Sequence, residues 1–157
     1  GLTPVVWPML HIDAGTIGTY DGLEVDTVAS ADGEAVTFTT NAAPALVMAD
    51  QSLSDMGDMG MVLTIKNALM DAPGWIAIHS DNNGAPGPVI ATALLHAGAN
   101  WNVHIPVDAA AAGAKVFPML HYDTNTMGTY EFGTVEGADS PVFVQENVIV
   151  APLNITQ

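Results

Sequence analysis

The stretch VWPMLHID at residues 6–13 returns later in the chain as VFPMLHYD at residues 116–123. The match continues to Tyr20 and Tyr130, so that ten of the fifteen positions from residue 6 to residue 20 are identical at an offset of 110 residues. Each copy reads as an apolar strand that leads into a turn ending at the tyrosine. We expect the two copies to adopt the same conformation.

The rest of the chain reads as short strands separated by turn formers such as DAPG at residues 71–74 and DNNGAPG at residues 81–87. Only residues 108–114 have a helix-forming composition, sufficient for one or two turns. This pattern predicts an all-β fold, an antiparallel, immunoglobulin-like β-sandwich with a duplicated hairpin segment. The predicted strands cover residues 5–12, 35–39, 45–48, 61–65, 75–79, 89–95, 101–107, 116–122 and 142–150.

The repeat also predicts the domain organisation. An offset of 110 in a chain of 157 residues leaves one complete unit and a second copy of its closing part. We therefore expect an N-terminal copy of the closing segment at residues 1–42 and a complete sandwich unit at residues 43–157. Three placements of the N-terminal copy are open: the end of a preceding unit in a longer tandem array, a part of the same sandwich, or insertion into a neighbouring subunit.

For insertion into a neighbour, the contacting residues are expected within residues 2–39. The strand there is apolar on both faces, and it would be an aggregation hazard if it were left in water. Val5, Trp7 and Met9 are the expected interface residues.

The charge of the chain is strongly unbalanced. Seventeen acidic residues oppose only Lys66 and Lys115, for a formal net charge of −15. Two lysines cannot form a basic patch, and no stretch approaches the ~20 apolar residues of a membrane span, so neither nucleic-acid binding nor membrane insertion is expected. The expected partners are copies of the chain itself, and cations. Because the chain has no cysteine, disulfides, thiolate zinc sites, cysteine nucleophiles and blue-copper sites are excluded.

Charged residues make up only 12% of the chain and hydrophobic residues 49%, whereas an ordinary soluble domain has about 25% charged residues. A large uncharged surface is typical of self-associating proteins. The chain opens at Gly1 rather than Met, as it would after removal of a leader, and offers few lysines to proteases of the trypsin type. Both observations favour an extracellular or cell-surface location.

Three stretches together resemble a known family: MLHYDTN at residues 119–125, TYEF at 129–132 and GWIAIHSD at 74–81. The family is a secreted domain of unknown function in haloarchaeal and bacterial surface proteins, often in tandem copies. The resemblance covers roughly residues 45–152, and the N-terminal copy matches the last third again, departing at residues 14–15. It implies a β-sandwich at the cell surface and no particular reaction.

Oxygen ligands for a hard cation follow the second copy of the repeat. Asp123, Asn125 and Glu131 are candidate ligands of Ca²⁺, although the spacing is not that of an EF-hand. The alternative is a turn in which the Asp and Asn side chains cap backbone N–H groups. We expect no cofactor to be required, with Ca²⁺ as the candidate ligand, and little or no dependence of folding on metal.

Two further groups of side chains are candidate metal ligands. Met56, Met59 and Met61 present thioethers at the short spacing that Cu(I) favours, with packing of apolar gaps as the alternative. His11 and His121 occupy equivalent strand ends. We expect each to donate a hydrogen bond to a backbone carbonyl or to the Asp two residues on, with a metal site as the alternative.

No catalytic motif is present, so we do not expect an enzyme. The expected function is that of a secreted structural subunit that self-associates into an extracellular filament, sheath or surface layer. One alternative is an extracytoplasmic copper- or calcium-binding β-sandwich module. The other is an adhesive repeat of a larger surface protein.

Overall fold

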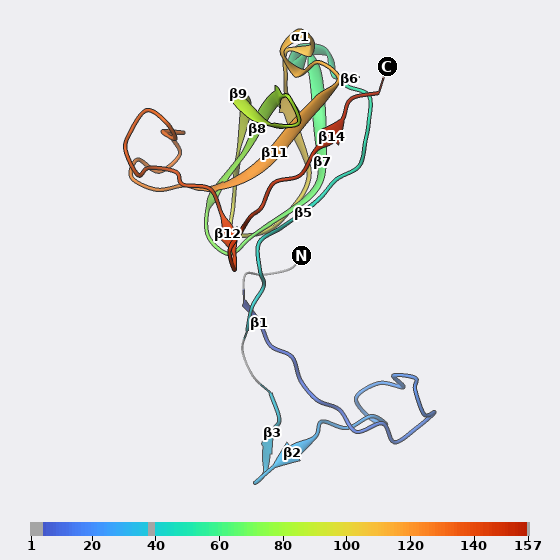
Figure 1. The fold of residues 1–157 in the computed structure, drawn as a ribbon. Coiled ribbons are helices and arrows are strands. Elements are labelled where there is room, and N and C mark those ends of the chain that lie inside the picture. The colour runs from blue at the N-terminus through green and yellow to red at the C-terminus, as the bar shows by residue number, and fades with distance from the viewer. Residues whose placement is uncertain (1–4, 38–39, 157) are drawn as a thin grey trace. The chain divides into compact units, whose positions relative to one another are not determined.

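The computed structural model describes residues 5–37 and 40–156. The chain divides into two compact units, which we call the N-terminal unit, Val5–Asn41, and the main unit, which begins at Ala42 (Figure 1). Antiparallel strands dominate both, and the prediction of an all-β sandwich is confirmed.

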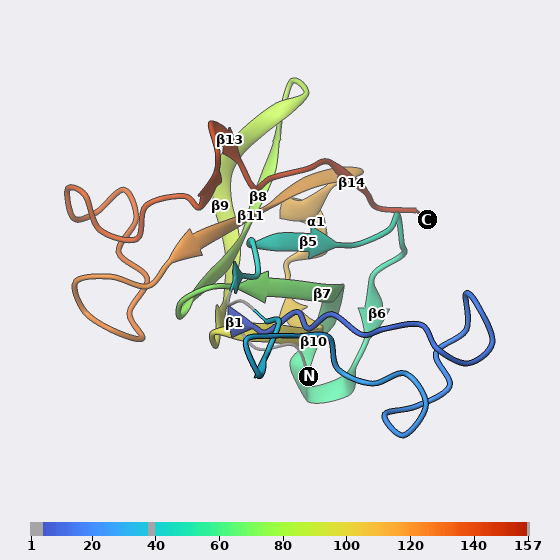
Figure 2. The same ribbon diagram turned by 90° about the horizontal axis from the view of Figure 1, so that it is seen from below.

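The main unit contains two antiparallel sheets, which Figures 1 and 2 show from two directions. The first sheet consists of β10 (Gly98–Pro106), β7 (Met61–Met70) and β5 (Ala45–Val47), with β6 (Ser54–Asp55) also paired to β7. The second sheet has the order β14 (Leu153–Asn154), β11 (Lys115–Tyr122), β8 (Gly74–Asn82) and β9 (Ala85–Leu95). A short helix, α1 (Ala109–Ala112), connects β10 to β11. We call residues 45–107 the body and residues 115–154 the closing segment.

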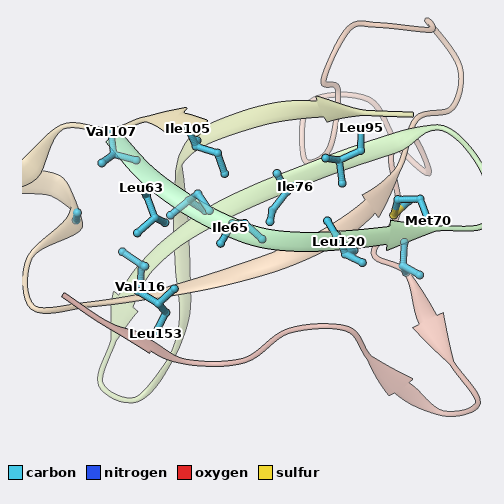
Figure 3. Close-up of a cluster of buried hydrophobic side chains, with 14 residues drawn as sticks. Leu63, Ile65, Met70, Ile76, Leu95, Ile105, Val107, Val116, Leu120 and Leu153 are labelled. Carbon is cyan, nitrogen blue, oxygen red and sulfur yellow. The ribbon is translucent and has the colours of Figure 1, made fainter. Parts of the chain in front are cut away.

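The core lies between the two sheets. Side chains at alternate positions point inward, and Figure 3 shows Ile65 on β7 and Ile76 and Leu120 on the facing sheet directed into the same interior. The strand β8 is buried on both faces, with an unbroken run from Gly74 to His79. Its outer face must therefore be covered by something other than the first sheet, and this cover is the loop described below.

The strands β7, β8 and β9 are longer than the sequence predicts. The strand β8 continues to Asn82, and β9 begins at Ala85. Residues 81–87 are therefore not one long turn. Only Asn83 and Gly84 remain between them, and both have positive φ, as a two-residue hairpin turn requires. Prolines at residues 86 and 88 are tolerated within this strand because β9 is an edge strand, where a missing N–H costs little. The strand β7 likewise runs to Met70 rather than ending at residue 65.

The prediction of one continuous strand at residues 142–150 was wrong, because the structure has a hairpin there. The strands β12 (Phe143–Val144) and β13 (Asn147–Val148) are joined by a turn at Gln145, which has a φ of 57°. A glutamine rarely adopts this conformation, so the sequence carries no turn signal at this point.

In the N-terminal unit the predicted strand at residues 5–12 is continuous only over β1 (Val5–Val6), which pairs with β4 (Thr40–Asn41). Beyond β1, single bridges at Met9 and His11 continue the pairing. The strands β2 (Ser30–Ala31) and β3 (Glu34–Ala35) form a hairpin. Residues 38–39 belong to the predicted strand at 35–39 and lie outside the described residues. Residues 2–4, which belong to the expected contact region at 2–39, also lie outside them.

Gly74 provides a test of how closely β8 approaches β11. A Cβ atom at this position would clash with the carbonyl oxygen of His121 and with the Cε of Met70. Since the backbone oxygen cannot move away without breaking the sheet, we expect Gly74→Ala to lower the free energy of unfolding by about 1–3 kcal/mol. Urea unfolding measures the change, and a variant as stable as the parent would contradict the close approach.

Candidate functional site

The loop between β11 and β12, at residues 123–142, contains the predicted calcium ligands and projects from the sandwich in both views (Figures 1 and 2). Its central residue is Asp139, which is fully buried. The two carboxylate oxygens of Asp139 accept backbone N–H groups from Thr124 at 2.8 Å and from Glu131 at 2.6 Å. Thr124 Oγ1 in turn accepts the N–H of Asp139 at 2.8 Å. Asp139 therefore clamps both ends of the loop together.

Two more carboxylates complete the clamp. Asp123 accepts the N–H of Gly128 at 2.8 Å, and Glu131 accepts the N–H of Thr126 at 2.9 Å. The Asn125 amide donates to Glu131 at 2.8 Å. The hydrogen bonds from Asn125 and Thr126 lower the pKa of Glu131.

This geometry bears on the calcium prediction. The structure brings Asn125 and Glu131 together, while Asp123 is bound to a different part of the loop. Among residues 5–37 and 40–156, no group of three or more His, Asp or Glu side chains could hold a metal ion. The oxygens instead accept backbone N–H groups, as in the turn alternative. Calcium binding stays a prediction.

The outer face of β8 and β11 carries an aromatic cluster that sequence reasoning missed. Trp75, His79 and His121 come from the two strands, and Tyr130 and Phe132 come from the loop. The ring centroids of His121 and Phe132 are 4.6 Å apart, those of Trp75 and Tyr130 5.7 Å, and those of His79 and His121 5.9 Å in a stacked arrangement. The signal in the sequence was the alternation of Trp75 and His79 on one face of a strand, opposite the repeated histidine.

Both histidines of this cluster are held by backbone carbonyls. His121 Nδ1 donates to Asp139 at 2.7 Å, and His79 Nδ1 donates to Gly87 at 2.7 Å. In the neutral form of each ring Nε2 is then an acceptor, and neither Nε2 finds a hydrogen-bond partner among the described residues. Burial lowers the pKa of His121, and burial together with the nearby Asp139 raises the pKa of Tyr130 to about 12.

The buried imidazole of His121 predicts a dependence of stability on pH. Its pKa is lowered from the ordinary value of 6.5, so as the pH falls below 6.5 the unfolded chain takes up a proton that the folded chain does not. Stability should therefore be fully present above pH 6.5 and decline as the pH falls towards the lower pKa of the folded state. Thermal unfolding between about pH 8 and pH 5 measures this. The variant His121→Asn, which keeps an N–H donor, should show a flatter profile.

His96 provides the control because its side chain is exposed and its Nδ1 donates to the adjacent Ala97 carbonyl. His96→Asn should follow the parent profile. If His121→Asn also followed it, the assignment of the pH dependence to His121 would be wrong.

The candidate copper ligands and two other polar side chains lie outside this cluster. Met56, Met59 and Met61 are exposed around the turn between β6 and β7, and copper binding by them stays a prediction. Asp81 accepts the N–H of Gly84 at 2.7 Å and so belongs to the β8–β9 hairpin turn. His104 contacts the Thr64 hydroxyl at 3.1 Å on the surface.

The N-terminal unit repeats the carboxylate clamp. Asp13 accepts the N–H of Gly18 at 2.7 Å, and Asp26 accepts the N–H groups of Ala14 at 3.1 Å and Asp21 at 2.5 Å. The N–H of Asp21 is the main cause of the lowered pKa of Asp26. His11 Nδ1 donates to the Asp26 carbonyl at 2.8 Å, as His121 does to Asp139. The predicted equivalence of the two copies thus extends to their hydrogen bonds.

The sequence analysis did not identify Asp26 and Asp139 as equivalent positions in the two copies. The recognised identity ends at Tyr20 and Tyr130, and the following segment is three residues longer in the second copy. The carboxylate therefore lies at a different offset, and only the shared hydrogen bonds reveal the match.

A family described as a domain of unknown function (DUF7282) matches residues 45–156. The chain belongs to the DUF7282 family. The DUF7282 match begins at β5 and includes the body and the closing segment, so the resemblance to an uncharacterised domain family is confirmed. The N-terminal unit lies outside the match, although it repeats the last part of the DUF7282 domain. No curated protein and no solved structure matches the chain.

Proposed function

We propose that this DUF7282 chain is a secreted structural subunit that associates with units of its own kind in an extracellular filament, sheath or surface layer. One observation carries the proposal: the N-terminal unit exposes the apolar side chains that the closing segment buries. Trp7 is 67% exposed and its counterpart Phe117 is 6% exposed. An exposed patch of this kind is characteristic of surfaces that bind other proteins.

The use of the polar side chains supports a structural role. The carboxylates of Asp123, Glu131 and Asp139 are the natural candidates for acid–base chemistry, and each accepts backbone N–H groups within its own loop. The imidazole of His121 is fully buried. These groups hold the loop against the sheet.

The net charge determines how association should depend on salt. A charge of −15 with only two lysines gives strong repulsion between copies at low ionic strength. In about 1 M salt the Debye length is only about 3 Å, so the apolar contact can dominate. The proposal therefore includes association that strengthens with salt. Among the described residues, none of the helices is long and apolar enough to cross a membrane.

Analytical ultracentrifugation and electron microscopy of the full chain in about 0.1 M and about 1 M salt test the proposal. We expect larger assemblies at the higher salt concentration. The double variant Trp7→Asp, Leu10→Asp should prevent their formation. The matched control is Trp101→Asp, which changes an exposed tryptophan on β10 and should leave association unchanged. A parent chain that stays monomeric at both salt concentrations would overturn the proposal.

One observation favours a second candidate function, an adhesive repeat of a larger surface protein. The N-terminal unit duplicates a whole closing segment rather than a single strand, and this is what the end of a preceding repeat would contain.

A further inference from the structure

We infer that residues 5–41 are the closing segment of a second β-sandwich, whose body has the fold of residues 45–107, precedes them in a polypeptide and has no closing segment of its own. This inference rests on the second candidate function, a repeat of a larger surface protein, because it names the partner of the exposed surface. It is supported by a match in backbone pairing, by a contrast in side-chain burial and by the number of available partners.

The backbone pairing of the N-terminal unit is that of the closing segment. Each pair of strands or bridges in one has a counterpart in the other, in the same order along the chain. The matched pairings are Val5–Asn41 with Lys115–Asn154, Val6–Thr40 with Val116–Leu153, Met9–Thr37 with Met119–Val150, His11–Val28 with His121–Pro141, and β2–β3 with β12–β13.

Side chains that are buried in the closing segment are exposed at the matched positions of the N-terminal unit. Leu120 is 0% exposed and Leu10 is 57% exposed. Leu120 is covered because β11 pairs with β8, where it lies opposite Ile76. Among the described residues, no strand pairs with the opposite edge of residues 7–12. What the N-terminal unit lacks is therefore a strand equivalent to β8 and the core behind it.

A second folded copy of the chain does not supply this strand. Its β8 is already paired on both edges, with β11 and with β9. Each copy also carries two closing segments, residues 5–41 and 115–154, for one body. Exchange of segments between copies would always leave one segment per copy uncovered. The required partner is a body without its own closing segment.

The connection in the main unit indicates where that body lies. The strand β10 leads through the four-residue helix α1 directly into β11. A body joined to the N-terminal side of Val5 would reproduce this connection. The clamp at Asp26 keeps the N-terminal loop in the form that Asp139 gives its counterpart, so the segment already has the shape that a body accepts.

The test adds the missing body to the full chain. Residues 42–114 are placed directly before Val5 of the chain, so that Ala114 is followed by Val5 as it is normally followed by Lys115. Because the chain has no cysteine, a single Leu10→Cys thiol reports on the matched position without background. Ile17→Cys, in the exposed part of the loop, is the control.

We expect the Leu10→Cys thiol to react rapidly in the parent chain and about 100-fold or more slowly in the extended chain, as a core position does. The Ile17→Cys thiol should react rapidly in both. The extended chain should also gain a second cooperative unfolding transition, which Leu10→Asp removes while the transition of the main unit remains.

An unchanged Leu10→Cys rate, or no added transition, would overturn the inference. So would slow labelling of the parent chain in about 0.1 M salt, where repulsion keeps the copies apart, because Leu10 would then be covered without an added body. A parent chain that stays monomeric in the ultracentrifuge would overturn the proposed self-association, and it would leave the labelling result of the extended chain unaffected.

Discussion

Leu120→Ala is expected to lower the free energy of unfolding of the main unit by about 3–5 kcal/mol. The Leu120 side chain is fully buried in the cluster between the two sheets, and its removal leaves a cavity that the neighbouring strands cannot fill. Leu10→Ala makes the same substitution in the same local sequence, and it should change stability by no more than about 0.5 kcal/mol because Leu10 is exposed.

Urea unfolding of the two variants, followed by circular dichroism, measures both changes. The comparison is informative because residues 6–20 and 116–130 share most of their sequence. Similar losses in the two variants would mean that the N-terminal unit is buried in solution and that its exposed surface is not available.

Asp139→Ala is expected to destabilise the main unit by about 3–5 kcal/mol. The change removes the acceptor of two backbone N–H groups, from Thr124 and Glu131, and leaves them close to the buried aromatic cluster. Hydrogen exchange should show the amides of Thr124 and Glu131 losing protection first.

Two variants serve as comparisons for Asp139→Ala. Asp58→Ala, at an exposed position in the turn before β7, should leave stability unchanged. Asp26→Ala should loosen the N-terminal loop without changing the unfolding of the main unit. Normal amide protection in Asp139→Ala would show that the clamp does not hold the loop.

The repeated sequence was sufficient to predict the sandwich and the position of the loop, and the two copies share their pairing pattern although only β11 is a continuous strand. The repeated sequence was not sufficient for elements that depend on context. Pro86 is compatible with a strand only because β9 lies at an edge, and Asn67 is tolerated inside β7 only because it donates a hydrogen bond to Asn100. The turn at Gln145 contains no residue that is typical of turns, so the sequence does not predict it.

The position of the site was predicted, and its chemistry was left between cation binding and capping of backbone N–H groups. Asp123 and Glu131 accept backbone N–H groups from Gly128 and Thr126, but which amides they accept cannot be read from composition. The contact between His79 and His121 depends on the register of β8 against β11, and register is set by packing across the whole sheet.

The difference in loop length between the two copies has a consequence for engineering. The segment from Glu131 to Asp139 is three residues longer than the segment from Asp21 to Asp26, yet the same amides are held at both ends. The length of the chain between these two anchors is therefore decoupled from the strands that flank it. Residues 133–136 are exposed and mark the place where a foreign peptide could be inserted for display without disturbing the sandwich.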